Sequence, residues 1–239
     1  PYAMLHDLVD EAYIGLREYI STKVDWDYLA TLENAFVPLT SPLFPGMLDD
    51  WLYTGRAISL NTAPVNANWV VVMREDFGTS IYWRVFVRTR FQDGSQGRPL
   101  VDFPWDFNAR YSGDPRHYEQ GGSYGNQIPG GYWLDFTEVA LSLGWERLPA
   151  LASWKTAYNA ARHNEFIFSD GLDWITAMQE IYPADALATP TKVVPPTHTP
   201  TATRWPTLTP TLTRTPWPSH TPTPTRTATN TRIPPTPTP

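Results

Sequence analysis

The 239-residue chain contains no cysteine. Without thiols it can form neither a disulfide framework nor a thiolate metal site. Long apolar runs are also missing: the longest, such as residues 69–73, are far shorter than a bilayer crossing, so no membrane span or signal peptide is visible. Because the chain starts with Pro1 and stops inside a repeat, we expect a processed product or a fragment.

Acidic residues are absent from the C-terminal part. Residues 189–239 contain 19 Thr, 14 Pro and no Asp or Glu. Such a sequence has few large apolar side chains to bury, and proline removes amide donors, so neither helix nor sheet can offset the ordering entropy. The composition predicts an extended, polyproline-like stalk that follows one globular domain over residues 1–188. Tracts of this kind are typical of O-glycosylated extracellular stalks, so we expect the protein at the cell surface.

Basic residues are too sparse for nucleic-acid binding. Residues 1–188 hold 13 of the 18 Lys and Arg and all 24 Asp and Glu, a net charge of −11, and the other five Lys and Arg give residues 189–239 a charge of +5. Phosphate neutralisation needs clustered Lys and Arg, which neither part supplies. The 11 Trp form a heavy aromatic load that suits carbohydrate or other flat-surface contacts.

The residue pattern of the globular part predicts an α+β fold with a small mixed or antiparallel sheet and packed helices. Apolar residues recur at helical spacing over residues 2–20, and Asp25 is a candidate N-cap for a second helix that ends at Phe36. Two runs rich in β-branched and aromatic residues, 68–75 and 80–91, predict a hairpin. Further helices are expected over residues 133–143, 153–162 and 174–182, and further strands over 145–148 and 165–168.

The second strand of this hairpin has two different faces. Ile81, Trp83, Val85 and Val87 alternate with Tyr82, Arg84, Phe86, Arg88 and Arg90. The first set predicts a core face. The second set is cationic, either as a solvated face with Arg stems on aromatic rings or as an anion site. Residues 92–131 are rich in turn signals, and their aromatics Phe103, Trp105, Phe107 and Tyr111 predict an ordered, packed loop.

Common catalytic signatures are missing. The chain has no serine-hydrolase elbow, HExxH pair, Walker loop or dinucleotide fingerprint. The glycine-rich segment 121–131 lacks a Lys-Ser/Thr pair, and we interpret it as a loop. His6 and His117 are expected at the surface, and His163 alone is a candidate for chemistry. These residues do not make a zinc site, so we expect neither a metal nor another cofactor.

Residues 55–60, Gly-Arg-Ala-Ile-Ser-Leu, resemble a strand shared by the zinc D-alanyl-D-alanine carboxypeptidases and the Hedgehog signalling domain. Residues 143–149 and 165–168 resemble later elements of the same pattern, and the order of elements agrees over roughly residues 27–182. The resemblance implies zinc ligands at Leu52, Ser59 and Ile167 or Phe168, and a general base at Glu165. Since no ligand position can bind metal, it implies a pseudoenzyme that neither holds zinc nor cleaves D-Ala-D-Ala by that mechanism.

Two interpretations of this region remain open. In the first, Gly55 allows a close backbone approach, Arg56 pairs with Asp49 or Asp50, and Glu165 is a salt-bridged strand residue. In the second, the former pocket is retained as a binding cleft. Its predicted ligand contacts are Trp51, Tyr53, Arg56, Trp105, Asp106 and Glu165.

The sequence therefore predicts a non-catalytic, envelope-associated domain that binds a cell-wall peptide, a glycan or a neighbouring surface protein. Residues 93–100, 104–110 and 171–183 also resemble blocks in bacterial surface proteins with long Thr-Pro repeats. One alternative is a structural subunit of a glycosylated surface layer, sheath or filament that self-assembles through its tail. Another is a cell-wall peptidase or a glycoside hydrolase, for which the candidate acids are Asp102, Asp106, Asp135, Glu138 and Glu165.

Overall fold

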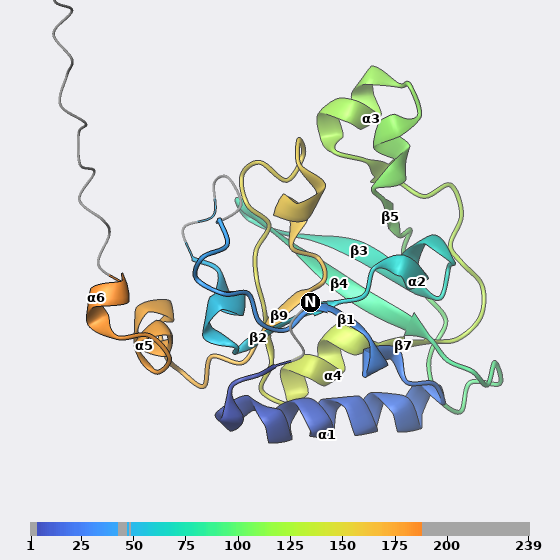
Figure 1. Ribbon diagram of the computed structural model, residues 1–239. Coiled ribbons are helices and arrows are strands. Elements are labelled where there is room, and N and C mark those ends of the chain that lie inside the picture. The colour runs from blue at the N-terminus through green and yellow to red at the C-terminus, as the bar shows by residue number, and fades with distance from the viewer. Residues whose placement is uncertain (1–3, 43–46, 48, 188–239) are drawn as a thin grey trace, which may run out of the picture. The chain divides into compact units, whose positions relative to one another are not determined.

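The computed structural model describes residues 4–42, 47 and 49–187, and residues Pro1–Pro190 form one compact unit. The stalk predicted over residues 189–239 lies outside the described residues. The expected α+β fold is confirmed, because helices pack against three small sheets with antiparallel strand pairs. Figure 1 shows α1 (Asp7–Val24) along one side, with α4 (Phe136–Ser142) packed between it and the sheets.

The first helix begins and ends differently from the prediction. His6 is its N-cap, because the Nδ1 atom of His6 accepts a hydrogen bond from the Leu8 backbone N–H (3.2 Å). Asp25 does not start a second helix: it has a φ of 56° and is the left-handed C-cap of α1, and its N–H donates to the Ser21 carbonyl. A short 3₁₀ helix, Tyr28–Ala30, and β1 (Leu32–Asn34) follow, since Tyr28 and Leu29 are buried in the core.

A four-stranded sheet forms the centre of the domain, in the order β1-β2-β9-β8. Its other strands are β2 (Ala57–Leu60), β8 (Glu146–Arg147) and β9 (Glu165–Ile167), so the strands expected near residues 145–148 and 165–168 are confirmed. One face buries Ile58 and Phe166 in the main core with residues of α1. The opposite face carries Ser59 and Glu165.

The expected helix over residues 153–162 is wrong. The segment instead forms turns and a 3₁₀ helix, Tyr158–Ala161. Ala160 and Ala161 are buried in an aromatic cluster, and Arg162, with a φ of 53°, reverses the chain into β9. Tertiary burial overrides the local helical preference of this alanine-containing segment.

The predicted hairpin is confirmed as β3 (Val70–Phe77) and β4 (Ser80–Arg88), and β7 (Trp133–Asp135) completes a second sheet in the order β3-β4-β7. The helix expected from residue 133 begins only at Phe136, because Asp135 caps α4 by accepting from the Glu138 N–H (2.9 Å). Residues 133–135 are therefore free to pair with β4.

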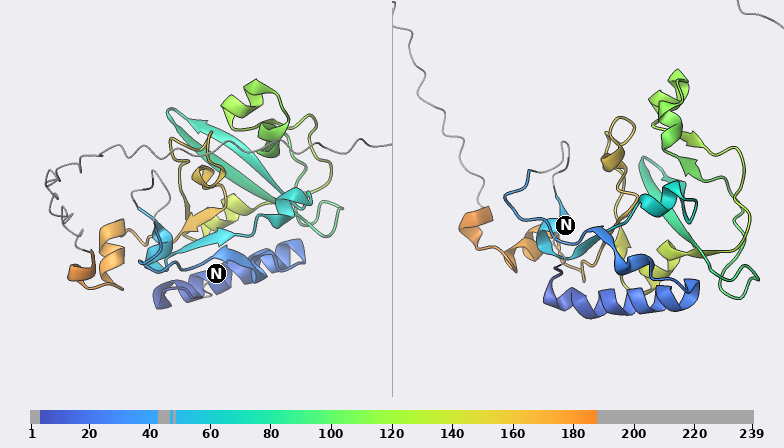
Figure 2. Two further views of the ribbon diagram at one scale, coloured as in Figure 1. Left: turned by 45° about the horizontal axis from the view of Figure 1, so that its top comes forward. Right: turned by 45° about the vertical axis from the view of Figure 1, so that its right-hand side comes forward.

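The remaining elements lie at two ends of the domain, as both views of Figure 2 show. At one end are β5 (Trp105–Asp106), β6 (Ser123–Tyr124) and α3 (Pro115–Gln120). At the other are α5 (Trp174–Gln179), as predicted near residues 174–182, and α6 (Ala184–Leu187). The short helix α2 (Ala63–Asn66) precedes β3. Among the residues with a described structure, no helix has the length and apolar character that a membrane crossing needs.

Candidate functional site

The positions that the resemblance assigns to zinc ligands gather around one face of the central sheet. Ser59 lies directly across from Glu165 in the β2–β9 pairing, and Ile167 is two residues further along the same face. Leu52 packs with Ile167 in an apolar cluster. Over the described part of the chain, no group of three or more His, Asp or Glu is arranged to hold a metal ion. Ser59 and Glu165 therefore present one hydroxyl and one carboxylate on this face, beside the hydrocarbon side chains of Leu52 and Ile167.

Glu165 is engaged in an ion pair with a neighbour. Arg162 Nε donates to Glu165 Oε2 at 2.8 Å, and both side chains are largely buried. Burial raises the pKa of Glu165, Arg162 opposes that rise, and the nearby Asp50 and Asp49 add to it by charge repulsion. The pairing agrees with the predicted salt-bridged role. The position that the resemblance assigns to a general base therefore holds a carboxyl group with a structural partner.

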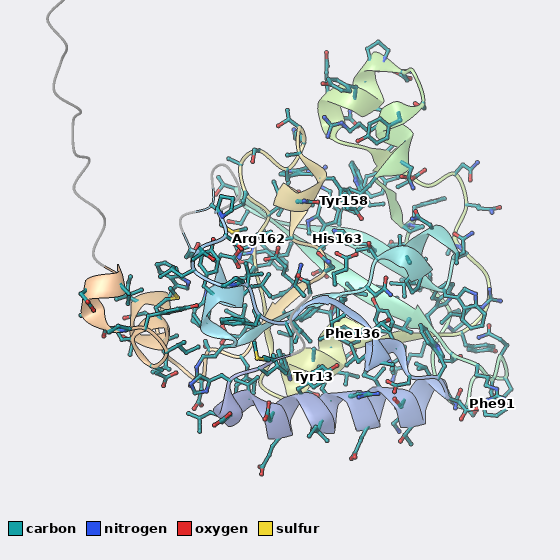
Figure 3. The ribbon with its side chains drawn as sticks, in the orientation of Figure 1. Tyr13, Phe91, Phe136, Tyr158, Arg162 and His163 are labelled. Carbon is teal, nitrogen blue, oxygen red and sulfur yellow. The ribbon has the colours of Figure 1, made fainter. Side chains whose placement is uncertain are left out.

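His163 lies beside this pair, in the interior. Figure 3 shows Tyr158, Arg162 and His163 close together. The His163 Nε2 and Tyr158 Oη atoms are 3.1 Å apart, and the Phe107 ring centroid lies 4.9 Å from the imidazole centroid. Burial lowers the pKa of His163 to about 4, so the ring is neutral in the folded protein at neutral pH. This environment makes His163 a core residue rather than a proton carrier.

Arg56 does not pair with Asp49 or Asp50. Its Nε and Nη2 atoms both lie 2.8 Å from Glu180 Oε2, because the end of α5 packs beside the start of β2. Asp50 instead caps the 3₁₀ helix Trp51–Thr54 by accepting from the Leu52 N–H.

Two more predicted ligand contacts have structural roles. Trp51 is buried in the apolar cluster that contains Leu52, and the Tyr53 hydroxyl donates to the Ser41 carbonyl at 2.6 Å. Neither residue, nor Arg56 or Glu165, lines either of the two grooves described next.

The other two predicted contacts, Trp105 and Asp106, do line a groove. This aromatic groove has a volume of about 610 Å³ and lies beside β5 and the 3₁₀ helix Asn108–Tyr111. Beside aliphatic residues such as Val70 and Val72, its wall includes aromatic rings and side-chain amides: Trp105, Phe107, Tyr111, Trp154, Tyr158, Asn66, Asn68, Asn108, Asn126 and Gln127. The structure thus separates the predicted site, with Trp105 and Asp106 in this groove and the others elsewhere.

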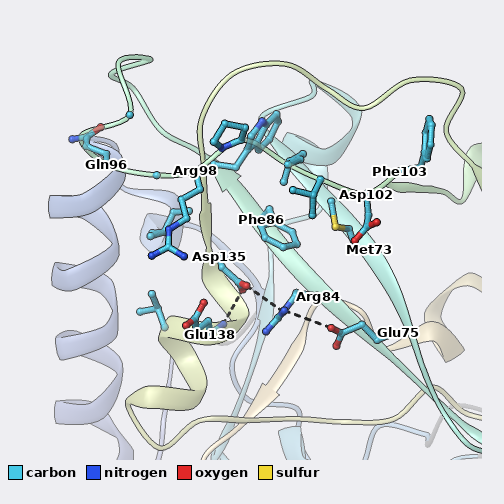
Figure 4. A pocket seen from close by; sticks show the side chains of 18 of the residues that line it. Met73, Glu75, Arg84, Phe86, Gln96, Arg98, Asp102, Phe103, Asp135 and Glu138 are labelled. Atoms are coloured by element: carbon cyan, nitrogen blue, oxygen red, sulfur yellow. Dashed lines mark hydrogen bonds and ion pairs between the residues drawn. The ribbon is translucent and has the colours of Figure 1, made fainter.

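A larger groove of about 1120 Å³ lies over the outer face of the β3-β4-β7 sheet (Figure 4). We call it the charged groove. Arg84 of β4 stands at its centre, with Nε 3.1 Å from Asp135 Oδ2 and Nη1 3.7 Å from Glu75 Oε1. Glu75 also pairs with Arg147, and burial raises the pKa of Asp135. The strands β3, β4 and β7 therefore supply one row in which a base, Arg84, lies between two acids, Glu75 and Asp135.

The rim of the charged groove is formed by the segment of residues 94–103 and by β6. Gly97 lets this segment cross the sheet closely, because a Cβ there would lie 2.6 Å from the Trp133 carbonyl oxygen. Two rings at one end are open to solvent, with exposed fractions of 45% for Phe103 and 54% for Tyr124. The charged groove is therefore lined by hydroxyl groups, by planar polar groups such as guanidinium and carboxylate, and by aromatic rings.

Sequence reasoning interpreted the Arg84 face as cationic, and this was incomplete. The acids that neutralise it come from β3 and β7, which pair with β4 on either side: Met73 lies opposite Arg84 in one register and Asp135 opposite Phe86 in the other. The alternation of Arg84 and Phe86 with the core residues of β4 was the sequence pattern that indicated this face. The acids that flank Arg84 depend on the register of β3 and β7 against β4, and the sequence alone does not specify that register.

Comparison of the chain with protein-family models, with curated proteins and with solved structures finds no match in any of the three. A function can therefore be inferred only from the geometry of the two grooves and of the face around Glu165.

Proposed function

We propose that this domain binds a glycan of the cell envelope in the charged groove and does not catalyse a reaction on it. The observation that carries the proposal is the placement of Arg84 between Glu75 and Asp135, in a groove that is also lined by the exposed rings of Phe103 and Tyr124. The stalk predicted from the sequence would display the domain at the cell surface.

The paired charges suit a neutral, hydroxylated ligand. Each sugar hydroxyl both donates and accepts a hydrogen bond, and the row offers guanidinium donors and carboxylate acceptors side by side. Because Arg84 is held by two acids, its orientation is fixed before the ligand arrives, which lowers the entropic cost of binding. The apolar faces of sugar rings can pack on Phe103 and Tyr124, as aromatic side chains in binding sites commonly allow.

Size and charge distinguish this ligand from the alternatives. The groove, at about 1120 Å³, exceeds the roughly 300–1,000 Å³ of small-molecule sites and fits several units of a polymer. A wall peptide with free carboxylates would need unpaired cations. Of the three arginines that line the groove, Arg74 pairs with Asp76 and Arg84 with Asp135, so only Arg98 has no acidic partner among the described residues.

We include the resemblance to the zinc carboxypeptidase and Hedgehog-type domains in this proposal. The meeting of Leu52, Ser59 and Ile167 around the face of Glu165 supports it. In such a relative the metal-dependent chemistry has been lost, and binding takes place on a different surface from the former catalytic face.

Binding of the full chain to insoluble cell-wall glycan and to soluble chitin oligosaccharides tests the proposal. We expect saturable binding that Arg84→Met abolishes and that Tyr124→Ala weakens about tenfold, which corresponds to about 1.4 kcal/mol, since the ring surface on which a sugar packs is removed. Arg116→Met is the matched control, because Arg116 is exposed, lies outside both grooves and, among the described residues, forms an ion pair with Asp114 alone. Absence of binding by the unmodified chain to any envelope glycan would overturn the proposal.

A second candidate, glycoside hydrolysis, is favoured by one observation: the raised pKa of Asp135 in a groove that also contains Glu75 and Glu138. However, Asp135 Oδ1 accepts from the Glu138 N–H and Oδ2 faces Arg84, so both oxygens have structural partners. Release of reducing ends from the bound glycan, lost in Asp135→Asn, would establish hydrolysis in place of simple binding.

A further inference from the structure

We propose that the two grooves form one continuous track, so that the ligand is a linear glycan long enough to lie in both. This inference rests on the proposed function and extends it from one groove to a ligand of defined shape. The track crosses a narrow crest, which we define as Phe103, Pro104, Tyr124 and Gly125.

The crest consists of two adjacent chain segments whose consecutive residues face different grooves. Phe103 lines the charged groove and Pro104 the aromatic groove, and likewise Tyr124 lines the first and Gly125 the second. The segments are tied together, because the Gly125 N–H donates to the Pro104 carbonyl at 2.8 Å and β5 pairs with β6. Two elements separate the two grooves: this two-stranded ribbon and the edge strand β3, whose residues 73–75 line the charged groove and whose residues 70–72 line the aromatic groove.

The crest is braced from below by rings that belong to the other groove. The Tyr124 ring meets the Trp105 ring edge to face, with centroids 5.1 Å apart. Arg74, which lines the charged groove, places its guanidinium 5.2 Å from the Trp105 centroid and 5.3 Å from the Trp154 centroid. Since Trp105 and Trp154 line the aromatic groove, these stacked contacts join the two walls. The exposed ring of Tyr124 is therefore a supported platform at the crossing point.

The aromatic groove offers the same chemistry as the charged groove to an uncharged sugar. It presents the exposed rings of Tyr111 and Tyr158, with amides such as Asn126 and Gln127 as paired donors and acceptors. Of its two charged residues, Asp106 accepts from the Asn108 N–H at 2.8 Å, and Arg110 lies over the Tyr118 ring, 4.9 Å from its centroid, with an Nε atom that has no hydrogen-bond partner among the described residues. A polymer of repeating neutral units can contact both grooves at once, whereas a compact ligand can contact only one of them.

The test is the length dependence of binding, measured by calorimetry on the full chain with chitin oligosaccharides from the disaccharide to the octasaccharide. We expect affinity to rise steeply once the chain is long enough to pass the crest, because the second groove then binds intramolecularly. Tyr111→Ala should lower the affinity for the octasaccharide about tenfold and leave the disaccharide unchanged. Tyr124→Ala should weaken binding of both.

Phe91→Ala is the matched control, since Phe91 is an exposed ring that lines neither groove and lies far from Tyr158 in Figure 3. All three substituted rings are solvent-exposed, so the variants retain the core, and their circular dichroism should match that of the unmodified chain. Short and long oligosaccharides of equal affinity, or an unaffected Tyr111→Ala, would overturn the continuous track and leave the proposed function standing. Failure of every length to bind would overturn both.

Discussion

Arg56 and Glu180, which are 124 positions apart in the sequence, form an ion pair in which Nε and Nη2 of the arginine both lie 2.8 Å from one carboxylate oxygen. The arginine side chain is 1% exposed and the glutamate side chain 29% exposed. The same oxygen lies 3.7 Å from His6 Nε2, so one carboxylate connects the start of α1, the start of β2 and the end of α5.

We expect Glu180→Ala to lower the free energy of unfolding by about 2 kcal/mol, because it leaves the Arg56 charge buried without its partner; the value lies between those for exposed and fully buried pairs. Asp27→Ala is the control, since it removes the more exposed Arg17–Asp27 pair, 42% and 40% exposed, and should cost under about 1 kcal/mol. Urea unfolding measures the free energy of unfolding of both variants. Equal losses of stability in the two would contradict the stabilising role of the buried Arg56–Glu180 pair.

The buried His163 should make stability depend on pH. Its pKa falls from 6.5 to about 4 on folding, so the stabilisation is complete above pH 6.5 and is lost as the pH falls towards 4, where the unfolded chain takes up the proton first. Between pH 7 and pH 4 the difference in unfolding free energy between the unmodified chain and His163→Gln should shrink by about 3 kcal/mol.

The unfolding free energy of His163→Gln must be subtracted from that of the unmodified chain at each pH. Asp50, Asp135 and Glu165 have raised pKa values, so they change the stability of both proteins with pH in the opposite direction. Parallel stability curves for the two proteins across this pH range would show that the imidazole is accessible to protons in the folded state.

Gly97 should be required for the shape of the charged groove. A Cβ there would meet the Trp133 carbonyl oxygen at 2.6 Å, where Arg98 and Trp133 exchange backbone hydrogen bonds of 2.9 and 2.8 Å. We expect Gly97→Ala to cost about 1–3 kcal/mol of stability and to weaken glycan binding, as overpacking usually displaces backbone. Gly130→Ala, whose Cβ would meet nothing within 4 Å, should change neither quantity. Denaturant unfolding together with calorimetry of glycan binding separates the two variants.

We expect the purified full chain to hold far less than one zinc ion per molecule and to release no D-alanine from a wall pentapeptide. The physical reason is that Leu52, Ser59 and Ile167 offer one hydroxyl and two hydrocarbon side chains where three metal ligands would be needed. Metal analysis by mass spectrometry after dialysis provides the measurement. Stoichiometric zinc would mean that other side chains form a site, and the pseudoenzyme assignment would be wrong.

Local pattern was sufficient for much of the fold. The hairpin β3–β4, helix α1 and the strand at residues 165–167 were predictable, because side-chain periodicity and turn residues lie within one short segment. Errors occurred where a single residue redirects the chain. Asp25 has the composition of an N-cap yet adopts the left-handed C-cap conformation, and the capping role of Asp135 moves the start of α4 by three residues.

The candidate site was only partly predictable. The density of aromatics around Trp105 indicated a packed functional loop, and Trp105 and Asp106 do line a groove. The contact between Arg56 and Glu180 could not be found in the same way, because nothing in either segment specifies its partner across 124 positions.

By itself, the sequence determined the α+β class, the absence of thiolate chemistry, the composition of the Thr/Pro-rich tail and the identity of Leu52, Ser59 and Ile167 at the positions that the resemblance assigns to zinc ligands, since each depends on residue identity or short-range periodicity. Only the tertiary structure decided that Glu75, Arg84 and Asp135 form one row, that a ribbon through Trp105 and Tyr124 divides two grooves, and that His163 is buried. These relations arise from strand register and from packing between distant segments. Interactions along the whole chain select them together, and no local sequence pattern specifies them.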